Sequence, residues 1–220
     1  NKKKGLKMMK PIISKDTLHI KDFPAYAKDY LLEERPISSI TLQSEQVNDM
    51  DFSKLELKAS RFQNCTFHSC FFEEASFVDV IFESCDFSNS IFADSYFERC
   101  QFVSCKCIGA NMRNTRIKQT SFEQSNFKYS FFDKANMSDV LFDCTDCTEL
   151  SIAEAKLKKF EARGSKFIKN NFFKTMLEAI DFSDNEFTMP TVSSPPEELR
   201  GVVVNMFQAV DLIGHWGVIV

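Results

Sequence analysis

The sequence predicts an all-β solenoid, a rod in which the backbone coils around an apolar axis. Large hydrophobic residues, mostly Phe, recur at every fifth position through most of the chain, and a column of mostly small residues lies two positions before them. The composition agrees, with 24 Phe against 4 Tyr, 1 Trp and 6 Gly in 220 residues. A repeat of fixed period is the sequence signature of solenoid architectures.

The large column runs from Phe52 to Phe187 without an insertion, and 18 of its 28 positions are Phe. Residues five apart point to opposite faces of a straight strand and lie about 140° apart around an α-helix, so neither element could bury this column on one side. The chain must therefore turn once per unit, and neighbouring coils should pair like strands about 4.8 Å apart. The predicted core repeat residues are Phe62, Phe67, Phe72, Phe77, Phe82, Phe87, Phe92, Phe97, Phe102, Phe122, Phe127, Phe132 and Phe142.

Two further columns complete the unit. Small residues such as Ser60 and Cys65 precede the large column by two positions, because the interior must admit them beside the rings without overpacking. The residue just before the Phe is often Asp or Asn, as at Asp86 and Asn111, which suits a turning backbone.

The N-terminal 36 residues form a basic tail and a predicted cap. Asp22 can act as the N-cap of a short helix that runs from Pro24 to about Arg35, and Pro36 ends it. We expect this helix to cover the first coil, since an open end would expose the apolar axis and unpaired strand edges. The repeat domain is then expected over residues 37–192.

Residues 193–220 are expected to form a C-terminal cap and dimerisation segment. Two prolines in SSPPEELRG break the repeat, and Asn205 can cap a helix from Met206 to about His215 that ends at Gly217. The apolar side of this helix either covers the last coil or, with a final strand over 218–220, joins a second chain. The candidate dimer residues are Met206, Phe207, Val210, Ile213 and Trp216.

Nothing in the sequence indicates catalysis, a metal site or a cofactor. Seven of the eight Cys fall in the small or the large column, which marks them as core residues and reduced thiols, and only Cys144 lies outside these columns. His19, His68 and His215 have no recognisable ligand or triad spacing, and no Gly-rich phosphate loop is present. The sequence therefore predicts a protein that is not an enzyme.

The sequence shows neither a membrane-spanning segment nor a secretory signal, and we therefore predict a cytoplasmic protein. No apolar run approaches the roughly eighteen residues that a membrane span needs. The first ten residues are basic, but the apolar stretch after them is too short and too polar for a secretory signal. We therefore expect no membrane association.

Charge is the most informative surface property. Residues 71–100 carry seven acidic side chains against one Arg, whereas residues 151–180 carry seven basic against three acidic. With twenty residues per coil, Glu83, Glu123 and Asp143 would lie in one stripe along the rod. An acidic patch of this kind can compete for a basic surface of a partner protein. The candidate partner-binding residues are Glu73, Glu74, Asp79, Glu83, Asp94, Glu123 and Asp143.

The repeat over residues 37–192 resembles the pentapeptide-repeat family, whose consensus is A(D/N)LxX with Leu or Phe at its centre. The resemblance implies four units per coil and a right-handed quadrilateral β-helix. Phe52 to Phe187 would then make about seven coils, a rod about 34 Å long at strand spacing.

Within that family the chain looks most similar to Qnr-type topoisomerase-protection proteins of the loopless kind, because no insertion breaks its register. The resemblance implies a homodimer and binding to DNA gyrase or topoisomerase IV as a DNA mimic, with quinolone resistance as the outcome and no direct contact with nucleic acid. The net charge of residues 51–190 is 4 negative, from 21 acidic and 17 basic side chains, against about twenty for 34 Å of B-DNA, so any mimicry is local. The alternative is a structural or adaptor protein with an unrelated protein partner.

Overall fold

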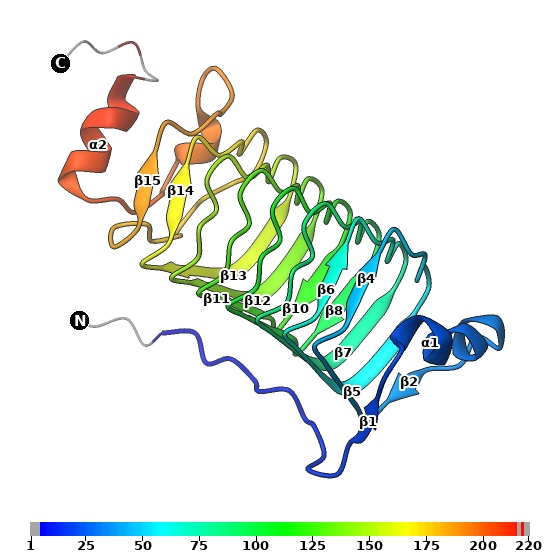
Figure 1. Cartoon of the computed structure of the whole chain (residues 1–220). Helices are drawn as coiled ribbons and strands as arrows, with labels where there is room; N and C mark the ends of the chain where they lie inside the picture. The colour runs from blue at the N-terminus through cyan, green and yellow to red at the C-terminus, as the bar shows by residue number, and fades with distance from the viewer. Residues whose placement is uncertain (1–4, 215–216, 218–220) are drawn as a thin grey trace.

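Residues of the repeat pair with the residues twenty positions farther along the chain in this computed structural model, which describes residues 5–214 and 217 (Figure 1). Leu57 pairs with Phe77 and Phe62 pairs with Phe82, both in parallel register. Four five-residue units therefore complete one turn, and the chain forms a solenoid of about nine turns. This confirms the predicted all-β solenoid.

The strands are short because each one ends where the chain turns a corner. They are β1 (Leu18–Ile20), β2 (Ile37–Ser38), β3 (Ile40–Gln43), β4 (Gln46–Asn48), β5 (Glu56–Gln63), β6 (Thr66–His68), β7 (Ser76–Glu83), β8 (Tyr96–Glu98), β9 (Gln101–Val103), β10 (Arg116–Lys118), β11 (Ser121–Glu123), β12 (Asn136–Asp143), β13 (Lys156–Arg163), β14 (Lys166–Ile168) and β15 (Glu186–Thr188). The helices are α1 (Phe23–Leu32), the single 3₁₀ turn η1 (Glu197–Leu199) and α2 (Met206–Ile213).

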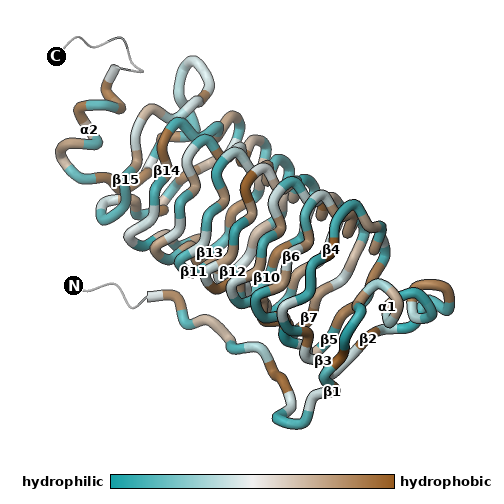
Figure 2. Tube along the Cα trace, viewed as in Figure 1, coloured by the Kyte–Doolittle hydropathy of each residue, from teal (hydrophilic) through white to brown (hydrophobic). Residues whose placement is uncertain are grey.

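The Phe column fills the axis of the rod. All thirteen core repeat Phe side chains are at most 3% exposed. Rings twenty residues apart lie on one another, as for Phe77 and Phe97, whose centroids are 4.9 Å apart with an interplanar angle of 13°. Rings five residues apart meet at steeper angles, as for Phe77 and Phe82 at 70°. The hydropathy tube shows the result, with hydrophobic positions recurring between hydrophilic ones along every coil (Figure 2).

The corners are made by left-handed residues two positions after each core residue. Every fifth residue from Glu34 to Ala179 has a positive φ, including Asn64 at 53°. Only Gly109 and Gly164 in this column avoid the cost of about 1–2 kcal/mol that an L side chain meets in this conformation. The interior packing and the ladder hydrogen bonds of neighbouring turns offset that cost.

The Asp and Asn residues before the core position stabilise these turns. Asp51 Oδ1 accepts a hydrogen bond from the Ser53 N–H at 2.8 Å, and Asp86 Oδ1 accepts one from the Ser88 N–H at 2.9 Å. Each carboxylate thereby binds a backbone donor at the bend, as Asx turns do. The turn-forming role expected for this column is confirmed.

The small column supplies hydrogen bonds to the interior as well as space. Ser90 is fully buried, its hydroxyl donates to the Phe67 carbonyl, and it accepts from the Cys70 N–H at 3.0 Å. Cysteine thiols take the same position, and Cys100 Sγ donates to the Phe77 carbonyl at 3.3 Å. These side chains satisfy backbone groups at corners where the regular ladder leaves them open.

Replacement of Ser90 by Ala is expected to lower the free energy of unfolding by about 1–3 kcal/mol, because a buried N–H and a buried carbonyl lose their partner. Urea denaturation followed by circular dichroism measures the loss. Ser90→Cys is the matched control and should lose less, since the thiol remains a donor. Equal losses for the two variants would contradict this role of the hydroxyl.

Helix α1 closes the first turn of the solenoid. Asp22 caps it, accepting a hydrogen bond from the Ala25 N–H at 3.1 Å. Phe23 is fully buried, and its ring centroid lies 5.1 Å from that of Phe52 and 5.4 Å from that of Phe62. The predicted N-cap and capping position are confirmed, whereas the helix ends at Leu32, earlier than expected.

The coil continues beyond residue 192, where the repeat domain was expected to end. Ala179 donates to the Gly201 carbonyl and Phe182 donates to the Val203 carbonyl, so residues 201–203 lie against the last full turn. The pairing of Asp181 with Val203 spans 22 residues instead of twenty. The segment with the two prolines thus adds two residues to the coil, which the five-residue pattern did not reveal.

Candidate partner-binding surfaces

The described part of the chain, residues 5–214 and 217, contains no group of three or more His, Cys, Asp or Glu side chains arranged as metal ligands. It also contains no helix long and apolar enough to cross a membrane. Seven cysteines are buried and Cys144 alone is exposed, and burial raises the pKa of the Cys100 thiol to about 12.

The candidate acidic residues do not share one surface. Ten residues correspond to half of a twenty-residue turn, so Glu73 and Glu83 lie on opposite sides of the rod. Glu74 and Asp94 lie at the corner next to Glu73, since both follow core residues on that side by two positions. A single flat partner surface cannot contact both groups at once.

Asp79 lies at a corner between the two groups and is already paired. It accepts hydrogen bonds from Arg99 Nε at 2.7 Å and from Arg99 Nη2 at 2.8 Å, and its side chain is 13% exposed. Its charge is therefore neutralised by the guanidinium of the next turn. Among the acidic candidates, Asp79 is the least available to a partner.

Glu83, Glu123 and Asp143 lie on one side of the rod, which we call the arm face. It comprises the outward positions flanking Phe82, Phe102, Phe122, Phe142, Ala162 and Phe182, together with the corner residue two positions after each of them. Between residues 81 and 184 this face carries one basic side chain, Arg163, and six carboxylates. The carboxylates belong to Glu83, Glu123, Asp143, Glu161, Asp181 and Asp184. Both Glu123 and Asp143 lack an ion pair within the described residues.

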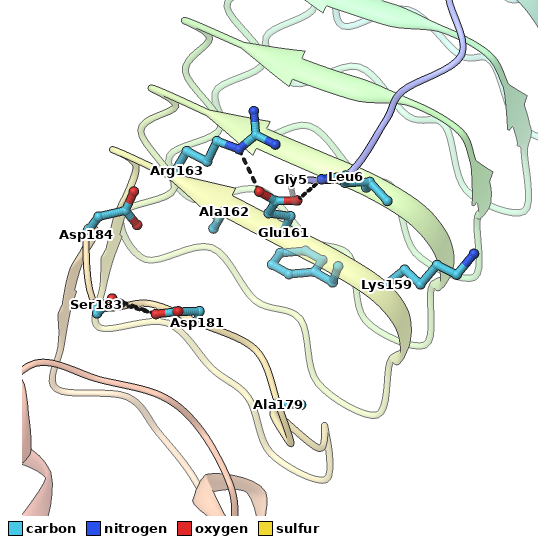
Figure 3. Close-up of a pocket in the computed structure, with 11 residues that line it drawn as sticks. Gly5, Leu6, Lys159, Glu161, Ala162, Arg163, Ala179, Asp181, Ser183 and Asp184 are labelled. Atoms are coloured by element: carbon cyan, nitrogen blue, oxygen red, sulfur yellow. Dashed lines mark hydrogen bonds and ion pairs between the residues drawn. The ribbon is translucent and has the colours of Figure 1, made fainter. Parts of the chain in front are cut away.

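The arm face takes its name from the N-terminal arm, residues 5–17, which runs along it from the level of β13 to β1 (Figure 1). The arm then enters the sheet, since β1 pairs in parallel with β3. Figure 3 shows one anchor, where Glu161 accepts hydrogen bonds from the Leu6 N–H and from Arg163 Nε. Gly5 and Leu6 also line a surface hollow of about 490 Å³ with Glu161 and Arg163.

The carboxylates that anchor the arm favour the charged form. Burial opposes ionisation of Glu161, but the hydrogen bonds from Arg163 and from the Leu6 N–H outweigh it and lower the pKa of Glu161. Burial likewise opposes ionisation of Asp79, and the Arg99 guanidinium more than compensates, so the pKa of Asp79 is also lowered. Both groups are anions at neutral pH.

Helix α2 presents an apolar surface at the C-terminal end. Asn205 caps it as predicted, and Gln208 completes a capping box. Gln208 and Leu212 face the last turn and are buried. The sequence left open whether the other apolar residues cover that turn, and they do not. Their exposed fractions are 75% for Met206, 82% for Phe207, 52% for Val210 and 39% for Ile213, whereas Trp216 and the strand expected over 218–220 lie outside the described residues.

The docked arm was not predicted from the sequence, in which the first residues read only as a basic tail. A signal was present in the outward positions of the arm face. Ile81, Val103 and Leu141 are apolar there, and Leu141 is only 5% exposed although it points away from the axis. Apolar residues at outward positions of one side indicate that something covers that side.

Comparisons with known sequences identify the repeat. A sequence model described as a pentapeptide repeat region matches residues 75–152, and one described as the SV2A/B/C luminal domain matches the overlapping residues 36–112. A search of curated proteins gives no match.

Comparisons with solved structures agree on the fold. Two trypsin-treated variants of QnrB1, a plasmid-mediated fluoroquinolone resistance protein, align with TM-scores of 0.52 and 0.53. Their sequence identities to this chain are 24% and 22%, and each alignment covers 82% of this chain and 90% or 91% of QnrB1. At this level of identity the likeness concerns the architecture.

Proposed function

We propose that this chain, a pentapeptide-repeat protein by its sequence pattern and its fold, is a non-enzymatic binding partner of a type II topoisomerase, DNA gyrase or topoisomerase IV. In this proposal it acts in the cytoplasm as a homodimer and protects the enzyme from quinolones. The fold likeness to the resistance protein QnrB1 supports the class of function. The observation that carries the proposal is the charge of the arm face, with six carboxylates against one Arg.

The magnitude of this charge fits a partial mimic of DNA. The arm face carries a net 5 negative charges between residues 81 and 184. These residues span five turn spacings, about 24 Å at strand spacing, and B-DNA of that length carries about fourteen charges. Before the arm is counted, the rod therefore presents about a third of the charge of DNA on one side. Residues 5–17 of the arm add a net 2 positive charges and lower this share to about a fifth. That is enough to attract a basic DNA-binding surface and too little to replace the whole duplex.

The proposal predicts that the purified protein restores gyrase supercoiling in the presence of ciprofloxacin. Glu123→Gln with Asp143→Asn should raise the concentration needed for half-protection about five- to tenfold, because two partly exposed charges contribute up to about 1 kcal/mol each. Glu73→Gln with Glu74→Gln removes the same charge from the opposite side and is the matched control. Supercoiling assays titrated with each variant measure the effect.

Two outcomes would contradict the proposal at different levels. If the protein neither protects nor inhibits nor binds gyrase or topoisomerase IV, the topoisomerase is not its partner. If the control variant is the one that loses protection, the contact lies on the side of Glu73 and Glu74.

A further inference from the structure

The N-terminal arm is anchored to the rod through its backbone. Three of its N–H groups, three residues apart, donate to side-chain oxygens on every second turn of the rod. The bonds join Leu6 to Glu161 Oε2 at 2.5 Å, Met9 to Gln119 Oε1 at 3.2 Å, and Ile12 to Asp79 Oδ1 at 2.9 Å. None of these bonds uses an arm side chain, so another extended chain could make the same contacts.

The spacing of the anchors follows from the dimensions of the two elements. Three residues of extended chain span about 10 Å, and two turns of the solenoid span about 9.6 Å. Asp79 and Gln119 are forty residues apart, which is two turns. The Ile12 and Met9 N–H groups therefore meet acceptors two turns apart in one column, and the Leu6 N–H meets Glu161, two positions off that column and a further two turns along. The rod thus matches the period of an extended peptide laid along its axis.

The burial of outward residues on the arm face and the charge of that face both suit a basic extended segment such as the arm. Leu141 lies on the turn between those of the Leu6 and Met9 anchors, and Ser121 lies two residues after the Met9 anchor Gln119. Their exposures of 5% and 1% at outward positions indicate that this side is covered. The arm is basic, with Lys7 exposed in its described part, and it lies on the most acidic side of the rod. The arm thus supplies cover and backbone donors, and its positive charge is complementary to the charge of this face.

We propose that the arm face is a docking site for an extended, lysine-bearing segment of a partner protein, and that the arm closes this site by occupying it in cis. The partner segment takes the place of the arm and uses the same three acceptors, Glu161 on the arm face and Asp79 and Gln119 at the corner that borders it. The inference rests on the arm contacts and stands or falls independently of the topoisomerase.

The test removes the backbone donors without removing buried side chains. Met9 and Ile12 are 53% and 68% exposed, so Met9→Pro with Ile12→Pro deletes two anchoring N–H groups and no buried apolar surface. Met9→Ala with Ile12→Ala removes the same side chains, keeps the N–H groups and is the matched control. A nitroxide spin label on Cys144, the exposed cysteine, broadens the NMR signals of nearby amides. Broadening of the arm amide signals therefore reports that the arm lies on the rod. We expect broadening in the wild type and the alanine variant, and its loss in the proline variant.

Docking is then measured by fluorescence anisotropy with two labelled peptides. One has the sequence of residues 1–13, and the other carries Lys at every third position with Ala and Gly between. A tethered arm has an effective concentration on the order of 1 mM, so both peptides should bind the proline variant at least tenfold more tightly than the wild type or the alanine variant. Adding Glu123→Gln and Asp143→Asn to the proline variant should weaken binding about tenfold, and adding Glu73→Gln and Glu74→Gln should not.

Each other outcome overturns the inference. Peptides that bind no variant show that the face does not take an extended basic segment. Peptides that bind the wild type and the proline variant equally show that they bind elsewhere. If only the peptide of residues 1–13 binds, the face is specific for the arm and does not serve a partner. An arm that remains docked in the proline variant shows that the backbone donors do not hold it.

Discussion

Replacement of Phe77 by Ala is expected to lower the free energy of unfolding of the solenoid by about 3–5 kcal/mol. The side chain is 1% exposed, and its ring lies 4.9 Å from that of Phe97 and 5.8 Å from that of Phe82. Truncation removes the transfer free energy of the ring and leaves a cavity that the neighbouring rings cannot fill, because the backbone ladder holds them in place. Urea denaturation followed by circular dichroism measures the loss.

Phe71→Ala is the control for this prediction. Phe71 has the same side chain on the neighbouring unit, but it points outward and is 38% exposed. Its replacement should change the free energy of unfolding by less than about 1 kcal/mol. Because each turn contacts only its neighbours, Phe77→Ala can also split the transition into two. Comparable small losses for the two variants would mean that the stacked column does not dominate the stability.

Two charged substitutions on α2, Phe207→Glu with Val210→Glu, are expected to convert the proposed homodimer into a monomer. These residues and Met206 form an exposed apolar surface on a capped helix, and burial of such a surface against a second copy would be its driving force. Two carboxylates placed at the centre of that interface would have to be desolvated without partners. Sedimentation velocity measures the change in mass.

Point substitutions test this interface better than removal of the C-terminal segment. Gly201 and Val203 accept ladder hydrogen bonds from the last full turn, so truncation after Arg200 would open the end of the core. Leu32→Glu is the control, because Leu32 is 74% exposed on α1 at the other end of the rod. A wild-type monomer, or a double variant that still sediments as a dimer, would contradict the proposed interface.

The prediction of the core from sequence succeeded because burial repeats locally. Any unit that places Phe62 inside must place Phe67 inside by the same geometry, so the period alone identifies the buried column. The helix starts at Asp22 and Asn205 were also predictable, since an N-cap acts within three residues of itself. The small column was predicted for its size, but its hydrogen bonds to carbonyls of the preceding turn, as at Ser90, require the coil.

The sequence by itself therefore determined the solenoid, its Phe core and the two capped helices, because each follows from contacts within a unit or between identical units. Only the tertiary structure decided which charges share a side. That depends on four units making one turn, which separates Glu73 from Glu83 and brings Glu123 beside Asp143. It also decided where the arm lies, because three hydrogen bonds to side chains 67 to 155 residues away leave no periodic trace in the sequence.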